Sequence, residues 1–436
     1  MKNMKKKGFT LVELLVVIAI VAILAAVSVV GYTVFINRAN ESADIQAVTQ
    51  MNTILSADGA VTPTTQGRLF EVLAEAGLNA KDYSPLYANR YFYWDKDLNR
   101  VLYVDENDNI IYPENATSSG KWYSLSGKIN TAGGKDYSNT SLSTPTITME
   151  IASGADFVKA AEFIRKQGNT LGAKTVEIVL NGDINLMGAD VCFTQDSTQS
   201  LNVVFKSNEA GTQRTISGLY ISDAHSTTGH DSDGNANNTY GHSLFNYIND
   251  LTVTDIIIAD STIGGTNASQ SGFFAGQIQN GTFTNVDVID CDVYGLNKVG
   301  VLFGYGHGQI TLTDVNIDNC NVYAKDGEAG VVFGVAERSK VPTTELLVKV
   351  ENVNITNCSV QIVAESKVVT AKDASNNEYD VVQVSETKWR VSTANIGFIS
   401  DSNSPAKVSL DGANGEGALY LGVDTLDELS SIKGLK

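Results

Sequence analysis

Basic residues and proline are scarce in this chain of 436 residues. It contains 31 Lys and Arg against 49 Asp and Glu, which gives a formal net charge of −18. This balance argues against a nucleic-acid partner, because such a partner would require a basic patch. There are only 6 Pro, and none of them precedes Pro63. No proline therefore interrupts a helix in the first part of the chain.

Cysteine is also scarce, and this limits the role of disulfides. The four cysteines form no CxxC pair, and four in so long a chain do not make a disulfide scaffold. By contrast, 43% of the residues are hydrophobic and 38 are Gly, mixed with many Asn, Asp, Ser and Thr. This composition allows a sizeable core and favours many short strands joined by turns.

The longest apolar run lies near the amino terminus, in "KKKGFTLVELLVVIAIVAILAAV" (5–27). Residues 14–30 carry no charge and approach the length that spans a bilayer. Apolar residues then continue at helical spacing to Leu55, so we expect one helix from Phe9 to about Leu55. A signal peptide or a plain membrane anchor would also explain the apolar run. Neither requires Glu13, a carboxylate that is costly among apolar residues.

The stretch "KKKGFTLVELLVVIAI" resembles the amino terminus of type IV pilins and pilin-like proteins. The resemblance implies that prepilin peptidase cleaves after Gly8 and that Phe9 is then N-methylated. It also implies that Glu13 acts in assembly, by meeting the Phe9 amine of a neighbouring subunit. The expected partners are the peptidase, other pilin subunits and the assembly machinery. The expected location is the cytoplasmic membrane for the precursor and the cell surface or pilus afterwards.

The segment after this helix predicts a small α+β head. Residues 1–8 form the leader, 9–57 the transmembrane and assembly helix, and 58–125 the head. We expect a short amphipathic helix over 68–83 that ends near Gly77. Aromatic and β-branched runs at 91–94, 101–104 and 110–112 alternate with Asp- and Asn-rich turns, which predicts a three-stranded antiparallel meander. The Ser-, Thr- and Gly-rich stretch that follows predicts an extended linker over 126–147.

A repeat appears after residue 240, in "TDIIIADSTI", "TNVDVIDCDV", "TDVNIDNCNV" and "ENVNITNCSV". Apolar residues alternate inward within each copy, but their parity switches just before one small residue. A parity switch marks a corner in the chain, and an Asp or Asn stands there in every copy. The small residues, spaced by 30, 29 and 38 residues, are Ser261, Cys291, Cys320 and Cys358. The motifs "GFFAG", "GVLFG" and "GVVFG" separate the copies and predict a third strand.

Units of about thirty residues that stack in this way predict a right-handed parallel β-solenoid over 148–412, with a carboxy-terminal tail at 413–436. An amphipathic helix over 152–169 is expected to cap it. The region resembles surface proteins with glycine-rich GLUG-type repeats. Stacked at one inward position, the cysteines should form a ladder of small buried groups. A disulfide between neighbours stays possible, but a line of thiols does not suit a metal.

Two weaker motifs suggest chemistry. "GHG" at 306–308 occurs in polygalacturonases, but the accompanying Asp pair and Arg-x-Lys are missing, so we interpret it as a glycine turn. Asp231, Asp233 and Asn235 alternate as in the opening of a calcium loop, but His242 stands where the bidentate Glu belongs. We therefore prefer a solvated loop. We predict no cofactor and no metal.

The expected function is a minor or tip pilin-like subunit that displays a non-enzymatic adhesion domain for a glycan or protein ligand. A bulky solenoid would obstruct the lateral packing of a major pilin. Two alternatives stay open: a surface-anchored carbohydrate-active β-helix enzyme, and a pseudopilin of a secretion system. Paired carboxylates in a groove would favour the enzyme, whereas a smooth face of Asn, Thr and Asp would favour binding.

Overall fold

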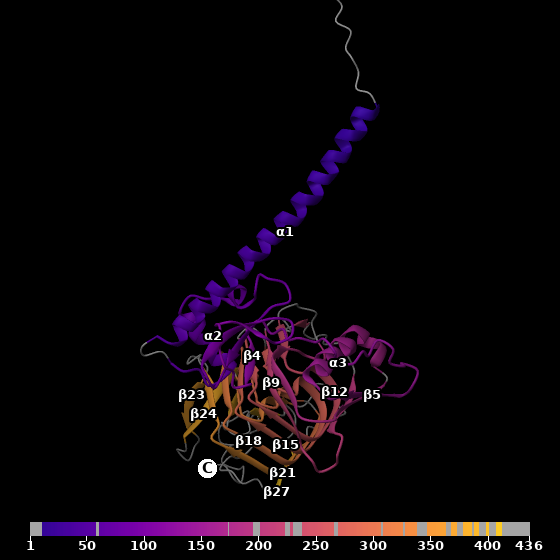
Figure 1. Cartoon of the computed structure of the whole chain (residues 1–436). Coiled ribbons are helices and arrows are strands. Elements are labelled where there is room, and N and C mark those ends of the chain that lie inside the picture. Colours follow the sequence, from indigo (N-terminus) through magenta and orange to yellow (C-terminus); the bar gives the residue numbers. More distant parts are fainter. Residues whose placement is uncertain are drawn as a thin grey trace, which may run out of the picture.

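The computed structural model describes residues 11–411, except for 58–60, 173, 195–200, 223–226, 230–237, 266–268, 307, 326–327, 338–346, 363–367, 373–377, 386–387, 392–397 and 401–406. A long helix leads away from a body that consists mainly of β-strands (Figure 1). The expected order of helices, small antiparallel sheet and large parallel region is confirmed.

The first helix, α1, runs over Leu11–Leu55 without interruption. Its carboxy-terminal half buries the predicted apolar stripe against the head, with Val48 and Met51 fully buried and Leu55 5% exposed. The described apolar residues of its first half are exposed. The uncharged run over 14–30 extends beyond the side chains that are described. Among the described residues, no helix combines the length and the apolarity that a membrane crossing requires.

The head contains α2 (Gln66–Glu75), a short 3-10 helix η1 (Ala80–Tyr83) and a four-stranded antiparallel sheet. The helix that was predicted to end near Gly77 is confirmed as α2, although it begins two residues earlier, at Gln66. The left-handed φ of 91° at Gly77 ends this helix, and residues 80–83 form the separate turn η1. The predicted meander is confirmed as β1 (Tyr91–Asp95), β2 (Arg100–Val104) and β3 (Ile110–Tyr112). A strand that was not predicted, β4 (Trp122–Ser124), pairs with the other edge of β1.

The remaining strands form one large sheet, whose pairings are all parallel, and two small sheets. The large sheet contains β5 (Thr146–Ile151), β6 (Thr175–Leu180), β7 (Ile184–Asp190), β8 (Asn202–Ser207), β9 (Arg214–Ile221), β12 (Phe245–Ala259), β13 (Thr262–Ile263), β15 (Ala275–Ile289), β16 (Asp292–Gly295), β17 (Phe303–Gly306), β18 (Gln309–Asp318), β19 (Asn321–Ala324), β20 (Phe333–Glu337), β21 (Leu347–Thr356), β22 (Ser359–Ile362), β26 (Phe398–Ser400) and β27 (Lys407–Asp411). The small sheets contain β10 (Thr227–Gly229), β11 (Asn238–His242) and β14 (Ser269–Ser271), and β23 (Val368–Lys372), β24 (Glu378–Ser385) and β25 (Lys388–Val391).

Strand register agrees with the repeat that the sequence predicts. Val286 of β15 pairs with Val315 of β18, which pairs with Val353 of β21. The same step joins Ile256 of β12 to Val286. Each pairing places equivalent residues of consecutive repeats side by side, and their inward side chains share one continuous core.

The chain adopts a left-handed conformation at each predicted corner. The φ angles are 46° at Asp260, 56° at Asp290, 51° at Asn319 and 53° at Asn357. Asp and Asn tolerate this conformation better than most residues, because their short side chains can hydrogen-bond locally. A second set of left-handed residues, five positions earlier in each repeat, was not predicted. Its members are Asp255, Asn285, Asp314 and Asn352.

The sequence predicted a strand at the "GFFAG" and "GVLFG" segments, but only the last part of each segment is a strand. Gly272, Phe273 and Phe274 form a bend, and β15 begins only at Ala275. The bend still follows the repeat, since Phe273 N donates to Val301 O over 2.8 Å and Phe274 N donates to Leu302 O over 3.1 Å. Their side chains enter the core at the end of each repeat.

The helix expected over 152–169 is α3 (Gly154–Gln167), followed by a 3-10 turn η2 (Gly168–Leu171). Ser153 caps its amino terminus by accepting from Asp156 N, and the predicted apolar face is buried. The segment expected as a linker contains no helix or strand over 126–145, and β5 begins at Thr146. It lies against the large sheet: Asp190 N donates to Gly127 O over 2.7 Å, and Tyr137 Oη donates to Glu150 O over 2.6 Å.

Candidate functional site

The amino-terminal site is described only in part. Gly8 and Phe9 lie outside the described residues, whereas Glu13 occupies the first turn of α1. Its neighbours Val12 and Leu14 are exposed apolar side chains. A carboxylate there interacts favourably with the positive end of the helix dipole, whereas its surroundings would be apolar in any helical bundle. The role of Glu13 in assembly stays a prediction from the sequence.

The structure places Ser261, Cys291, Cys320 and Cys358 at equivalent positions of consecutive repeats. Each follows a left-handed Asp or Asn, and each hydroxyl or thiol donates to the carbonyl oxygen two residues earlier. The donor-to-acceptor distances are 2.7 Å for Ser261 to Ala259, 3.1 Å for Cys291 to Ile289, 3.3 Å for Cys320 to Asp318 and 3.1 Å for Cys358 to Thr356. This position therefore requires a small side chain that also donates a hydrogen bond.

The thiols also contact one another. Hydrogen bonding with the Cys291 thiol, together with burial, raises the pKa of Cys320 well above its ordinary value. Hydrogen bonding with Cys320 likewise raises the pKa of Cys358. Cys291 and Cys320 are fully buried, and Cys358 is half-buried. Because the thiolate is the reactive form, the raised pKa values predict low thiol reactivity for Cys320 and Cys358.

Replacing Cys320 tests the packing of this ladder. We expect Cys320→Ala to lower the free energy of unfolding by about 1–2 kcal/mol, because it removes a buried sulfur and one weak donor. Cys320→Ser should cost less, since serine occupies the equivalent position at Ser261. Cys320→Arg should prevent folding of this region. Denaturant unfolding ranks the free energies of unfolding of these variants. Rapid reaction of native Cys320 with a thiol reagent would contradict its burial.

Many carboxylates outside the apolar core are held by carboxamides of the neighbouring repeat. Asn Nδ2 donates to Asp Oδ1 over 2.6–3.0 Å in each of these pairs: Asn285 with Asp255, Asn319 with Asp290, Asn352 with Asp314, Asn321 with Asp292 and Asn357 with Asp318. Stacked carboxylates would repel one another, and the alternation with Asn replaces that repulsion with a hydrogen bond. These acidic residues therefore serve the stacking of repeats.

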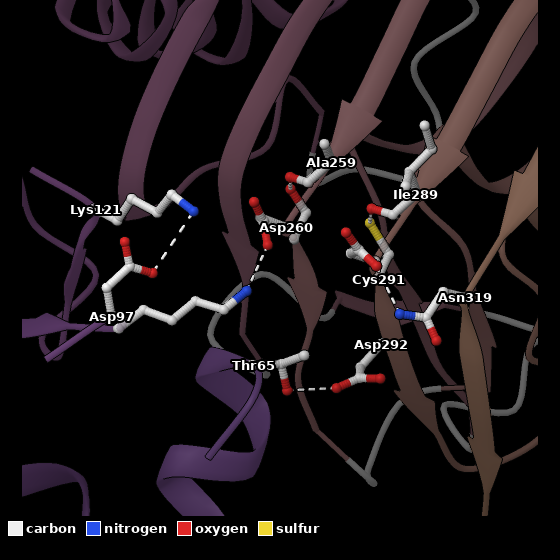
Figure 2. A network of polar contacts seen from close by, with 12 residues as sticks. Thr65, Asp97, Lys121, Ala259, Asp260, Ile289, Cys291, Asp292 and Asn319 are labelled. Atoms are coloured by element: carbon white, nitrogen blue, oxygen red, sulfur yellow. Dashed lines mark hydrogen bonds and ion pairs between the residues drawn. The ribbon is translucent and has the colours of Figure 1, made fainter. Parts of the chain in front are cut away.

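The head contacts the large sheet through polar groups at and just after the corners (Figure 2). Lys96 Nζ lies 2.6 Å from Asp260 Oδ1, and both side chains are about a quarter exposed. Thr65, the N-cap of α2, donates its hydroxyl to Asp292, which is only 4% exposed. Asp292 also accepts from Asn321, so one buried carboxylate connects the head to two repeats.

Apolar and backbone contacts complete this interface. The ring centroids of Phe70 and Tyr220 are 5.3 Å apart, and Gly67 lies against Tyr294 so closely that a Cβ would be 2.9 Å from the ring. Gln66 Nε2 donates to Ser124 O over 2.7 Å, which links α2 to β4. Burial raises the pKa of Tyr294. The sequence contains no local signal for the contacts between the head and the large sheet, since residues that meet there, such as Phe70 and Tyr220, are far apart in the chain.

Most of the weaker candidate residues lie outside the described part of the chain. Asp231, Asp233 and Asn235 lie outside the described residues, as does His307 of the "GHG" motif. His242 is fully buried at the end of β11. Among the residues that are described, no three His, Cys, Asp or Glu side chains lie as a metal ion would require.

Comparison with known proteins finds a known motif at the amino-terminal end of the chain. Residues 3–29 match the family described as the prokaryotic N-terminal methylation motif. No solved structure matches the chain. The motif implies processing by prepilin peptidase and handling by pilus or secretion machinery. It also implies that the precursor is located in the inner membrane and is then assembled at the surface. The chain therefore carries a prepilin-type methylation motif, which indicates a pilin-like or pseudopilin-like subunit.

Proposed function

We propose that this protein is a minor or tip subunit of a type IV pilus that displays a β-solenoid as a binding domain at the cell surface. The methylation motif is the main support for the proposal, because it includes the start of α1. The other end of α1 is buried in the head, and the head contacts the large sheet. Assembly through α1 would therefore place the sheet outside the filament in a defined orientation.

The solenoid architecture is supported by the register of the parallel strands. Equivalent residues pair over successive repeats, and left-handed residues recur at two positions of each repeat. A chain that turns at the same places in every repeat returns to stack upon itself. The glycine-rich segments at the ends of the repeats are the basis for a GLUG-like assignment.

A binding role agrees better with the outward side chains than catalysis does. The carboxylates of Asp255, Asp290 and Asp314 are engaged in hydrogen bonds to asparagines. A glycoside hydrolase needs two carboxyl groups that flank a substrate. We therefore propose a non-enzymatic domain that binds a surface ligand. A pseudopilin would carry the same motif, and recovery in surface fibres separates the two.

Processing of the amino terminus tests the pilin assignment. Mass spectrometry of the surface protein should find methylated Phe9 as the first residue, with residues 1–8 absent. Gly8→Val should block cleavage, because a β-branched side chain would not fit a peptidase site that selects glycine. Lys5→Arg is a matched control that keeps the leader charge and should be processed normally. An intact leader in assembled material, or a cut elsewhere, would contradict the assignment.

A further inference from the structure

Two rows of threonines cross three neighbouring strands of the large sheet. Thr252 on β12 pairs with Thr282 on β15, which pairs with Thr311 on β18. Two residues further along the same strands, a second row has the same register. Its members are Thr254, Thr284 and Thr313. A Thr-x-Thr segment is thus repeated at one place in three consecutive repeats, and Figure 1 shows β15 and β18 side by side.

These threonines point away from the core. The residues between them, such as Val253, Phe283 and Leu312, are fully buried, and alternate residues of a strand face opposite sides. All six threonines are at least partly exposed, and Thr282 is the most exposed of them. Their hydroxyls make no hydrogen bond with any described residue. The hydroxyls are therefore available to an external ligand.

The threonine rows are uncharged in a protein of net charge −18. The nearest charged side chains lie where the rows end, at Lys206 on β8 and at Lys349 and Glu351 on β21. Along the strands, Asp250 precedes the first row and Asp314 follows the second, and each is hydrogen-bonded to an asparagine of the next repeat. The six positions include no aromatic ring on which a sugar could stack, and they lie on a sheet surface. A charged polymer or a small soluble ligand is therefore a poor match, because small ligands usually require a concave site.

The spacing of the hydroxyls is regular in two directions. Neighbouring strands lie about 4.8 Å apart, and residues i and i+2 of one strand lie about 6.6 Å apart. A threonine hydroxyl both donates and accepts a hydrogen bond, as each water oxygen in ice does. The adjacent methyl group restricts the orientations of nearby water. A solid that repeats such groups over two dimensions would match all six positions at once.

We propose that the rows formed by Thr252, Thr282, Thr311, Thr254, Thr284 and Thr313 bind the surface of ice. The neutral and regular array selects an ordered plane of water over a charged or soluble ligand. The proposal rests on the binding role given to this domain, but it does not depend on filament assembly. The domain would then attach the cell, or a fibre that carries it, to ice.

The test measures how much protein enters a slowly grown ice front, with the processed full-length protein purified from cells. The wild-type protein should be enriched in the ice fraction. Thr282→Lys should reduce the enrichment at least about tenfold, which corresponds to about 1.4 kcal/mol of binding free energy. Asn316→Lys adds the same charge at an outward position beyond the left-handed Asp314, and should leave the enrichment unchanged. Thermal unfolding of both variants checks their folding.

Further arms keep the outcome decisive. Thr282→Ser keeps the hydroxyl but removes the methyl group, and it should fold normally and reduce the enrichment several-fold. Exclusion of the wild-type protein from ice would overturn the proposal. So would equal losses in Thr282→Lys and Asn316→Lys, or threonine-dependent binding to microcrystalline cellulose or chitin in place of ice. Recovery of the protein in fibres is scored separately, so failure to bind ice leaves the pilin assignment testable on its own.

Discussion

Glu13→Ala subunits are expected to be processed normally and to be absent from sheared surface fibres. In the proposed assembly, the Glu13 carboxylate pairs with the Phe9 amine of a neighbouring subunit. Without the carboxylate, that amine would remain unpaired among apolar helices, which is strongly unfavourable, and the register between subunits would be lost. The ratio of protein in fibres to protein in membranes measures the effect.

Matched variants separate assembly from folding. Glu13→Gln keeps hydrogen bonding but loses charge assistance, so it should assemble partially. Removing a charge from the first turn makes the segment more apolar, so Glu13→Ala should remain in the membrane fraction. The head and the large sheet should unfold at the wild-type temperature, since Glu13 lies in the first turn of α1 and the residues of α1 that are buried in the head lie in its other half. Normal fibre content in Glu13→Ala would show that the segment is a plain anchor.

Gly334→Ala should prevent the last described repeats from folding stably. A Cβ at Gly334 would lie 2.0 Å from the carbonyl carbon of Lys298 and 2.4 Å from Val299 N. Both are backbone atoms, and Lys298 already adopts a left-handed φ of 54°. The neighbouring chain cannot move away without breaking the ladder, so the cost should be about 3 kcal/mol or more. A Cβ added at Gly304 would likewise lie 2.2 Å from the carbonyl carbon of Gln270.

A second glycine provides the control for this prediction. Gly182→Ala lies in a turn where no atom comes within 4 Å of the added Cβ, so it should change the free energy of unfolding little. Urea unfolding followed by circular dichroism compares the two variants. Equal stability of Gly334→Ala and Gly182→Ala would show that the close backbone approach does not constrain the fold.

Contacts between the head and the sheet affect how the domain would be presented. Lys96 binds the corner carboxylate of Asp260, Thr65 binds Asp292 in β16, and Phe70 packs on Tyr220. The segment over 126–145 is also held by hydrogen bonds. The threonine rows therefore have a defined orientation relative to α1, whereas a flexible linker would have let them rotate freely.

Local patterns in the sequence were sufficient for much of the fold. The repeat spacing predicted the register that joins Ile256, Val286, Val315 and Val353, because equivalent residues must stack when every repeat has the same inward pattern. The parity switch predicted corners at Asp260 and its equivalents, since a strand with a period of two cannot change parity without a turn, and the structure shows left-handed residues there. The aromatic and β-branched runs predicted the meander, because Asp- and Asn-rich turns separate them.

Features that depend on several repeats at once were not predicted. The second left-handed set, at Asp255 and its equivalents, changes which alternate residues of the strand face the core. The polar residues around Asp255 hide this change in the hydrophobic pattern of the sequence. The requirement for a hydrogen-bond donor at Cys320 became clear only when the thiol was placed beside the Asp318 carbonyl oxygen. The sequence suggested only a small apolar group at that position.

The sequence by itself determined the amino-terminal motif, the long helix, the meander and the period of the repeat, because each depends on a pattern of residues that are close together in the chain. Only the tertiary structure decided that α2 packs on the corner of the sheet, that Thr65 reaches Asp292, and that three Thr-x-Thr segments align into rows. These contacts join residues that are far apart in the chain, and their geometry depends on how whole strands and helices pack. A periodic pattern specifies which face of a strand is buried, but it does not specify what lies beside the other face.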